Sequence, residues 1–225
     1  PGGYDKYAAL EELIFDDARA RGQALLIVSL GDVIDRGPDS RKVIDRLLGA
    51  EADGVERLVV SGNHEITMAG FLRAPGYTHD WMHFGGVETL ESYGIDADAW
   101  FRQQRRRDEI AKDLADRIPE AHQRFVADLP YLVRFGTLVF VHAGIDRRKP
   151  PARQDEADMM WRRPDPAEEP GAAPDGLLVV HGHTPGPDVF VSERRINLDT
   201  GAYAGGPLSA ARFVDGRFDG ILDIR

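Results

Sequence analysis

Hydrophobic residues change their spacing along the chain, and each spacing predicts a different element. The first twenty residues repeat their apolar positions at the helical period, which predicts a helix ending near Gly22 with one apolar face: Tyr7, Leu10, Leu13 and Ile14. The run ALLIVSL at residues 24–30 follows directly and has the length of a buried strand. The segment PDSRKVIDRLLG at residues 38–49 then predicts a second helix that buries Val43, Leu47 and Leu48.

Strand patterns dominate the C-terminal half of the chain, after a long helical middle. RLVVSGN at residues 57–63 predicts a strand, and residues 65–129 are mainly helical in pattern. YLVRFGTLVFVHAG at residues 131–144 predicts a hairpin that turns at Phe135 and Gly136. Further strands are predicted within residues 176–184, 195–202, 209–216 and 216–224. The pattern therefore predicts a single α/β domain over residues 1–225 with a helical insert at about 65–129.

Four of these strands end beside glycine in residues that can bind a metal or move a proton. LIVSL leads to Asp32, RLVV leads to Asn63 and His64, LVFV leads to His142, and LLVV leads to His183. Any one of these ends is more simply explained as a turn, because Gly, Asp and Asn are the usual turn residues. Four together are hard to explain by turn chemistry, and the carboxyl ends of strands are where α/β folds bind ligands. We therefore expect an active site at these ends.

The residue types then select the chemistry. Carboxylate, carboxamide and imidazole ligands suit Mn, Fe or Zn better than a calcium cage. An aspartate can bridge two cations, and metals about 3.5–4 Å apart form the usual clamp for in-line attack on a phosphate. Arg36 could present its fork to phosphate oxygens, His64 could face the leaving group, and Asp35 could orient His64. Serine catalysis is disfavoured because no serine stands in a G-x-S-x-G turn.

Composition narrows the function further. The chain has 38 acidic and 28 basic residues, a net charge of −10, which argues against a nucleic-acid partner. The basic run in FRQQRRRDEIAKDLADRI at residues 101–118 is best explained as the solvated face of a charged helix. No apolar run approaches the length of a membrane span, so no membrane partner is expected. The absence of cysteine excludes disulfides, thiolate metal sites and a cysteine nucleophile, and fits a cytoplasmic location.

The motifs GDVIDRG, GNHE, HAG and GHTP, in this order, resemble the calcineurin-like metallophosphoesterases. The likeness is strongest to the serine/threonine phosphoprotein phosphatase family and its small bacterial and bacteriophage lambda types. It extends through HDWMHFGGVETLESYG at residues 79–94, MMWRR at 159–163 and INLDTGAYAGGPLSA at 196–210. The resemblance implies two mixed β-sheets packed as a sandwich between helices, the four-layer metallophosphoesterase fold.

The resemblance also implies a role for each site residue. Asp32 would bridge two divalent metal ions, most simply manganese, with iron or zinc as alternatives. Asn63, His142 and His183 would hold the second ion. His64 would be the general acid paired with Asp35, and Arg36 and Arg163 would bind phosphate. Arg162 is the alternative if the phosphate arginine is displaced by one position.

One family motif is absent. Asp-x-His, which supplies two ligands of the first metal, occurs nowhere in the sequence, and PGGYDKYAAL resembles the helix that follows it. We expect the motif to lie before Pro1, because losing its strand would leave buried backbone groups without partners. If it is truly absent, one weak metal site and little hydrolysis are expected.

Other polar and aromatic residues have simpler explanations. His181 is more simply a structural histidine than a ligand, although it alternates with His183. His79, His83 and His122 are expected at the surface or in helix packing. Trp81 and Trp161 are expected as core anchors, with Trp161 aiming the phosphate arginine. Glycine pairs at residues 85–86 and 205–206 predict turns or close backbone contacts.

The sequence thus predicts a metal-dependent phosphomonoester hydrolase. The first choice is a protein phosphatase that acts on phosphoserine or phosphothreonine, or on phosphotyrosine. A bis(5'-nucleosyl)-tetraphosphate hydrolase is the enzymatic alternative, and GNHE in place of GNHD leans towards the phosphatases. A metal- or phosphate-binding protein without catalysis is the third reading, which applies if Asp-x-His is missing.

Overall fold

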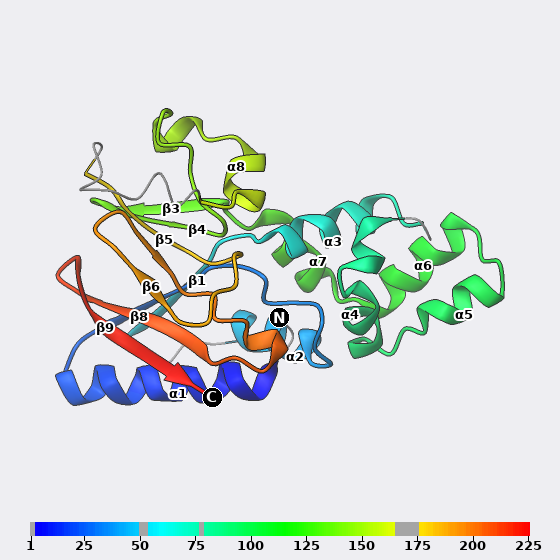
Figure 1. The fold of residues 1–225 in the computed structure, drawn as a ribbon. Helices are drawn as coiled ribbons and strands as arrows, with labels where there is room; N and C mark the ends of the chain where they lie inside the picture. The colour runs from blue at the N-terminus through cyan, green and yellow to red at the C-terminus, as the bar shows by residue number, and fades with distance from the viewer. Residues whose placement is uncertain (1–2, 50–53, 77–78, 165–175) are drawn as a thin grey trace. The chain divides into compact units, whose positions relative to one another are not determined.

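The computed structural model describes residues 3–49, 54–76, 79–164 and 176–225. These residues divide into two compact units, each described here by itself (Figure 1). The sheet unit comprises residues 5–31, 51–62 and 130–225, and the helical unit comprises residues 32–50 and 63–129 with the first four residues. This division follows the predicted change from strand to helix patterns.

The sheet unit contains three groups of paired strands. Strands β1 (Leu25–Ser29) and β2 (Val55–Val59) are parallel. The largest sheet has the order β3-β4-β5-β7-β6 and mixes parallel with antiparallel pairs. Its strands are β3 (Leu132–Phe135), β4 (Leu138–Val141), β5 (Leu178–His181), β6 (Phe190–Val191) and β7 (Arg195–Asn197). Strands β8 (Leu208–Val214) and β9 (Arg217–Ile224) form an antiparallel hairpin.

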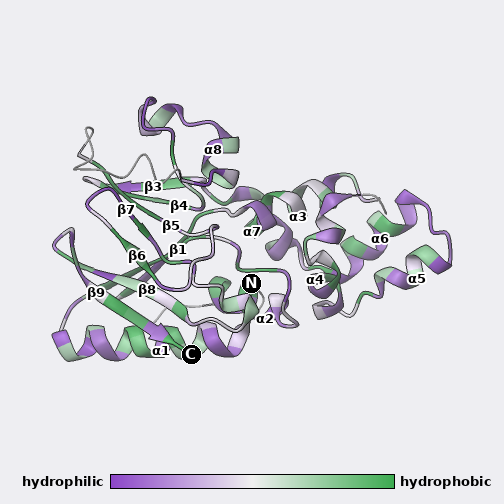
Figure 2. Cartoon of the chain, viewed as in Figure 1, coloured by the Kyte–Doolittle hydropathy of each residue, from purple (hydrophilic) through white to green (hydrophobic). Residues whose placement is uncertain are grey.

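An apolar core joins the sheets of this unit into a sandwich. Leu138, Phe140, Val180 and Ile196 of the five-stranded sheet are buried, and they pack against residues of the other strands, which include Val28, Leu30, Ala211 and Phe213. Figure 2 shows these strands mostly in the hydrophobic colour. Because β4 and β5 are covered on both faces, their sequences are continuous apolar runs, which explains why LVFV and LLVV read as buried strands.

Helix α1 (Tyr4–Arg21) is tied to the strands of the sheet unit by polar contacts. Arg57 of β2 donates to Glu11 at 2.7 Å, and both side chains are nearly buried. Arg212 of β8 donates to Asp17 at 2.7 Å, and Lys6 donates to the Gly206 carbonyl at 2.8 Å. The rest of the unit includes η2 (Pro151–Arg153), α8 (Glu156–Trp161) and η4 (Ala202–Ala204).

The helical unit confirms the helical pattern of residues 65–129. Its elements are α2 (Ser40–Leu48), α3 (Asn63–Arg73), η1 (Asp80–His83), α4 (Gly86–Ser92), α5 (Ala97–Arg102), α6 (Arg107–Arg117) and α7 (Glu120–Asp128). Its core contains Phe71, Trp81 and Leu90, each at most 1% exposed. Trp81 is thus the core anchor that the sequence predicts.

Two details of the predicted helices are wrong. Leu48 is 45% exposed, and Ile44 is buried in α2 instead, because Val43 and Ile44 face the core together. The charged segment at residues 101–118 is two helices, with Arg105 and Arg106 in the turn between them. Arg105 contacts Asp113 and Arg106 contacts Asp108, so these basic residues are paired locally at the surface.

No helix among the described residues is long and apolar enough to cross a membrane. The loop predicted at residues 162–176 falls mostly on residues 165–175, which lie outside the described residues.

Candidate active site

The loop GDVIDRG has an unusual backbone. Asp32, Asp35 and Arg36 have φ angles of 54°, 70° and 59°, in the left-handed region that residues with a side chain rarely adopt. In the sheet unit, His183 has the same feature, with φ 67°. Such residues cost free energy and cluster at functional sites, where surrounding contacts impose them. All four are residues that the sequence places in the site.

Glu65 imposes this loop conformation in the helical unit. Its two carboxylate oxygens accept hydrogen bonds from the backbone N–H groups of Asp32 and Val33, at 2.8 and 2.9 Å. Glu65 itself is 0% exposed. A buried carboxylate that takes two backbone donors holds those donors firmly in place, so Glu65 fixes the direction in which Asp32 leaves the loop. No motif of the sequence predicts this role of Glu65.

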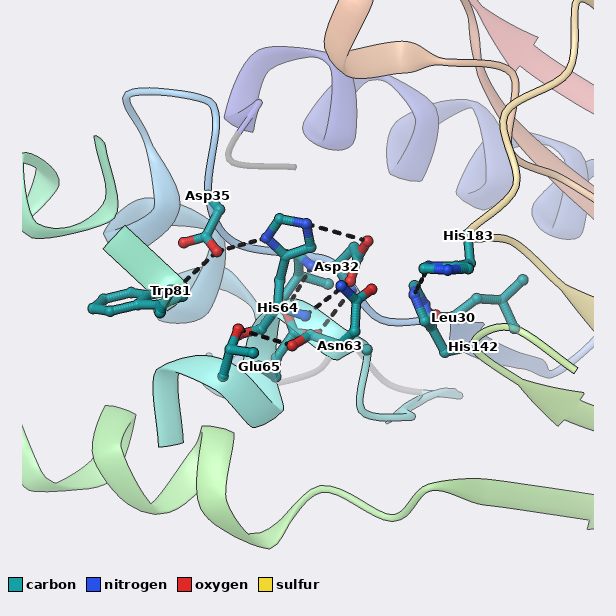
Figure 3. A network of polar contacts seen from close by, with 12 residues as sticks. Leu30, Asp32, Asp35, Asn63, His64, Glu65, Trp81, His142 and His183 are labelled. Carbon is teal, nitrogen blue, oxygen red and sulfur yellow. Dashed lines mark hydrogen bonds and ion pairs between the residues drawn. The ribbon is translucent and has the colours of Figure 1, made fainter. Parts of the chain in front are cut away.

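His64 and Asp35 form a buried acid–base pair. His64 Nδ1 lies 2.6 Å from Asp35 Oδ2, and the two residues are 1% and 0% exposed. The other ring nitrogen of His64, Nε2, lies 3.9 Å from Asp32 Oδ2, and the His64 backbone N–H donates to Asp32 Oδ1 at 3.3 Å. Figure 3 shows the His64 ring between the two carboxylates. The predicted pairing of Asp35 with His64 is therefore present in the structure.

The surroundings of this pair shift its protonation. Burial works against the charged form of His64, but the hydrogen bond that His64 donates to Asp35 and the charges of Asp32, Asp35 and Glu65 outweigh it, so the pKa of His64 is raised. Burial raises the pKa of Asp35, although its hydrogen-bond donors work in the opposite direction. The pair thus keeps its proton to a higher pH than an ordinary histidine does, as a general acid requires.

His142 and His183 form the second polar cluster, in the sheet unit. His142 Nδ1 lies 2.8 Å from the Leu30 carbonyl oxygen, which can only accept, so Nδ1 carries the hydrogen. The lone pair of His142 is therefore on Nε2, which lies 3.1 Å from His183 Nδ1 (Figure 3). A histidine whose second nitrogen donates to a backbone carbonyl is typical of metal ligands. These two residues could hold a metal ion.

Asn63 is the first residue of α3 and is 5% exposed. Its backbone carbonyl accepts from the Thr67 hydroxyl at 2.9 Å, which anchors the start of the helix. Asn63 follows Gly62, and Asp32 follows Gly31. A Cβ atom on Gly31 would lie 2.5 Å from the Gly62 nitrogen, so the two chain segments that lead to Asp32 and Asn63 touch at their glycines.

His181 has the environment of a structural histidine. The residue is 0% exposed. Its Nδ1 donates to the Gly182 carbonyl at 3.0 Å, and its Nε2 accepts from Arg195 at 3.3 Å. Burial lowers the pKa of His181 to about 4, so it is neutral at physiological pH. Both ring nitrogens have partners, as the simpler explanation predicts.

The arginine motif at the end of α8 differs from expectation. Trp161 is 44% exposed and lies edge-on to His183, with ring centroids 6.0 Å apart, so the prediction of a core anchor is wrong. Arg162 packs on the HAG turn, its Cδ 3.3 Å from where a Cβ of Gly144 would stand, and contacts Asp158 at 3.4 Å. Arg163 is exposed. The phosphate-binding role of Arg163 stays a prediction, and Arg162 is the arginine held against the HAG turn.

Arg36 is also exposed, and its backbone N–H donates to the Gly85 carbonyl at 3.4 Å.

The histidines expected in helix packing do pack there: His79 lies with its ring centroid 5.5 Å from that of Phe71, and buried His122 contacts the Tyr93 hydroxyl at 2.8 Å.

Comparison with known proteins identifies the class to which this fold and this set of residues belong. Residues 2–221 match the calcineurin-like phosphoesterase family, and the chain belongs to that family. Its members are phosphoester hydrolases that typically hold two divalent metal ions. The fold prediction and the family resemblance are therefore confirmed, and so is the prediction of an enzyme.

A named relative is the asymmetrical bis(5'-nucleosyl)-tetraphosphatase PrpE of Bacillus subtilis. It is 29% identical over 239 residues, which cover 95% of this chain and 88% of the relative. Among solved structures, a cold-active protein tyrosine phosphatase shares 16% identity with a TM-score of 0.53 over 83% of this chain. The chain spans 63% of that structure's chain. A metallophosphoesterase from Sphaerobacter thermophilus matches at 17% identity and TM-score 0.48, over 98% of this chain and 84% of that one.

Proposed function

We propose that this protein hydrolyses phosphomonoesters, with His64 protonating the leaving group. The proposal rests on the buried His64–Asp35 pair. His64 Nδ1 is engaged with Asp35 at 2.6 Å, so the other ring nitrogen, Nε2, faces Asp32. An alkoxide leaving group, as in a serine or threonine phosphate, departs with difficulty unless a proton is delivered to it. A polyphosphate leaves as a stable anion. A buried, proton-holding histidine is therefore most useful to a phosphomonoesterase.

We propose that Asp32, Asn63, His142 and His183 hold the divalent metal ions. The donor set supports this role, because a carboxylate, an amide oxygen and imidazole nitrogens suit Mn, Fe or Zn, and manganese is the first ion to test. When bound, such ions neutralise phosphate charge and acidify a water molecule. Glu65 fixes the backbone of Asp32, and the Leu30 carbonyl fixes the tautomer of His142. Both contacts hold the ligands ready for an ion.

The arginines complete the proposed mechanism. Arg36 and Arg163 are proposed to bind the phosphate oxygens, with Arg162 as the alternative to Arg163. A guanidinium binds two oxygens at once and neutralises charge that develops during the displacement. Protein phosphoserine, phosphothreonine or phosphotyrosine is the proposed substrate class, in the cytoplasm.

A second candidate is asymmetrical cleavage of a dinucleoside tetraphosphate. It is favoured by the relative PrpE, whose name carries that activity and which aligns with 95% of this chain. The leaving group of that reaction is a phosphate anion. If it is the main reaction, the proton supplied by His64 contributes little to it.

The test compares leaving groups in the variant His64→Asn. With manganese added, we expect turnover of an alkyl phosphate to fall about 10²–10⁴-fold, the usual contribution of a general acid. Turnover of nitrophenyl phosphate should fall far less, because nitrophenolate needs no proton. His83→Asn, a change at an exposed histidine of the same unit, is the control and should match the wild type.

Equal losses on both phosphates would overturn the assignment of His64 as the acid. Diadenosine tetraphosphate and a phosphopeptide are assayed beside them. Efficient cleavage of the dinucleotide alone, unaffected by His64→Asn, would favour the second candidate.

A further inference from the structure

The Asp35 carboxylate receives hydrogen bonds from three buried side chains of the helical unit. Oδ2 accepts from Trp81 Nε1 at 2.9 Å and is bonded to His64 Nδ1 at 2.6 Å. Oδ1 accepts from the Thr89 hydroxyl at 2.6 Å. Trp81, Thr89 and Asp35 are 0% exposed. Figure 3 shows Trp81 and His64 approaching the same carboxylate. Because the carboxylate is buried among these donors, their hydrogen bonds fix its orientation.

The directions of these hydrogen bonds follow from the donors available. An indole nitrogen can only donate, so Asp35 Oδ2 must accept from Trp81. Thr89 has one hydroxyl proton and gives it to Asp35, so in the 2.9 Å contact between the two hydroxyls Ser40 must donate to Thr89. The Asp35 backbone N–H points at both hydroxyl oxygens, at 3.0 Å each. The Asp35 carboxylate therefore accepts from both Trp81 and Thr89, and it acts as the acceptor for His64 as well, which leaves the Nδ1 proton on His64.

Trp81 is held in place by packing as well. A Cβ atom on Gly86 would lie 2.6 Å from the indole ring, and the Phe71 ring lies 5.0 Å from it. A Cβ atom on Gly85, whose φ is 105°, would lie 2.6 Å from the Arg36 nitrogen. Gly85 thus lets the segment approach the GDVIDRG loop closely, and Gly86 leaves room for the indole ring. The indole ring fills a fixed slot, so its N–H cannot turn away from Asp35.

We propose that Trp81 and Thr89 are positioning residues that hold Asp35 so that His64 presents Nε2, and not Nδ1, to the leaving group. The proposal rests on the proposed function, because it concerns the same proton transfer. It explains why one short segment, HDWMHFGGVETL, places its tryptophan and its threonine against the Asp35 carboxylate and Gly85 against Arg36. Neither Trp81 nor Thr89 touches the substrate in this account.

The test removes each donor while keeping the shape of the side chain. Trp81→Phe removes the indole N–H, and Thr89→Val removes the hydroxyl. Each should lower kcat for an alkyl phosphate about ten- to hundredfold, the usual effect of losing an outer hydrogen bond to an active residue. The KM should stay the same, and nitrophenyl phosphate turnover should change less than about threefold, because no proton is needed there. Thr89→Ser, which keeps the hydroxyl, should restore the alkyl activity.

The matched control is Trp100→Phe. Trp100 is 2% exposed and also donates its indole N–H to an aspartate, Asp113, at 2.7 Å, but this pair is remote in sequence from the GDVIDRG loop. Loss of this N–H in Trp100→Phe should lower the turnover of both phosphates by the same factor or leave both unchanged. Because the two substrates are compared in one sample, a fraction of unfolded protein lowers both rates alike and does not imitate the expected difference.

The outcomes separate the two proposals. Suppose that His64→Asn lowers turnover of the alkyl phosphate far more than that of nitrophenyl phosphate, but Trp81→Phe and Thr89→Val each lower both turnovers equally. The positioning role is then wrong and the proposed function stands. If His64→Asn shows no such effect, the proposed function itself fails. In the His64→Asn background, Trp81→Phe should add no further selective loss on the alkyl phosphate, and an additive selective loss would overturn the positioning role.

Discussion

The two polar clusters of the molecule differ in how their hydrogen bonds are completed. In the helical unit, Asp35 accepts from Trp81, Thr89 and His64, so protein donors alone satisfy the carboxylate. In the sheet unit, His142 directs a lone pair at His183 Nδ1 over 3.1 Å. The acid–base pair is organised by the fold itself, whereas the histidine pair is proposed to hold a cation. Removing metal should therefore affect the two clusters very differently.

The largest effect is expected where the metal is proposed to bind. His142→Ala and His183→Ala should each lose bound metal and lower turnover of every phosphoester by about a thousandfold or more, since the ligands act as a unit. Metal content after gel filtration and turnover with added manganese are measured together. His83→Ala is the control. A His142→Ala protein that keeps its full metal content and activity would refute this part of the account.

A smaller effect is expected where Glu65 holds the loop. In Glu65→Gln, one carboxylate oxygen becomes an N–H₂ group that faces a backbone N–H of Asp32 or Val33. The resulting unsatisfied donors should lower the free energy of unfolding by about 1–3 kcal/mol, measured by urea denaturation of the metal-free protein. Glu120→Gln, at an exposed helix position, should change it by less than about 0.5 kcal/mol. Equal stability of both variants would show that Glu65 does not support the loop.

The smallest effect concerns pH and a histidine outside the proposed site. Burial lowers the pKa of His122, although Asp45, 3.1 Å away, works in the opposite direction. A depressed pKa in the folded state means that the unfolded chain takes up the proton first as pH falls. The free energy of unfolding should therefore decrease below pH about 6.5 until the folded-state pKa is reached. His122→Gln should lose less stability than the wild type between pH 7.5 and 5.5; an equal loss contradicts this.

The central strands of the fold, β4 and β5, could be predicted because they are buried along nearly their whole length. LVFV and LLVV are continuous apolar runs for that reason, and the hairpin at Gly136 follows from its turn residue. The burial of Leu48 was predicted wrongly because the apolar residues of this short helix are adjacent in sequence and define two alternative apolar faces. Only packing decides that Ile44 is buried and Leu48 is exposed. The break between α5 and α6 was missed because charged residues favour both a helix and a turn.

The pairing of His64 with Asp35 could be predicted because both residues stand in recognisable motifs, whereas the metal and phosphate roles stay predictions. His64 and Asp35 do pair, because Asp35 stands in the loop after β1 and His64 in the first turn of α3, which follows the neighbouring strand β2. The roles of Glu65, Trp81 and Thr89 could not be predicted, since their partners lie 32 or more residues away and hydrogen bonds at that separation leave no periodic signal. The contact of Arg162 with the HAG turn and the exposure of Trp161 depend on the position at which α8 ends. The spacing of residues in the sequence does not predict that position.

The most direct test of the central claim is the dependence of the rate on leaving-group acidity. A series of aryl and alkyl phosphates is assayed with wild type and His64→Asn, and log kcat/KM is plotted against the pKa of the leaving alcohol. The wild type should show a shallow slope, because His64 supplies the proton, and the variant should show a steep fall as the alcohol becomes less acidic. Parallel lines for the two proteins would contradict the account.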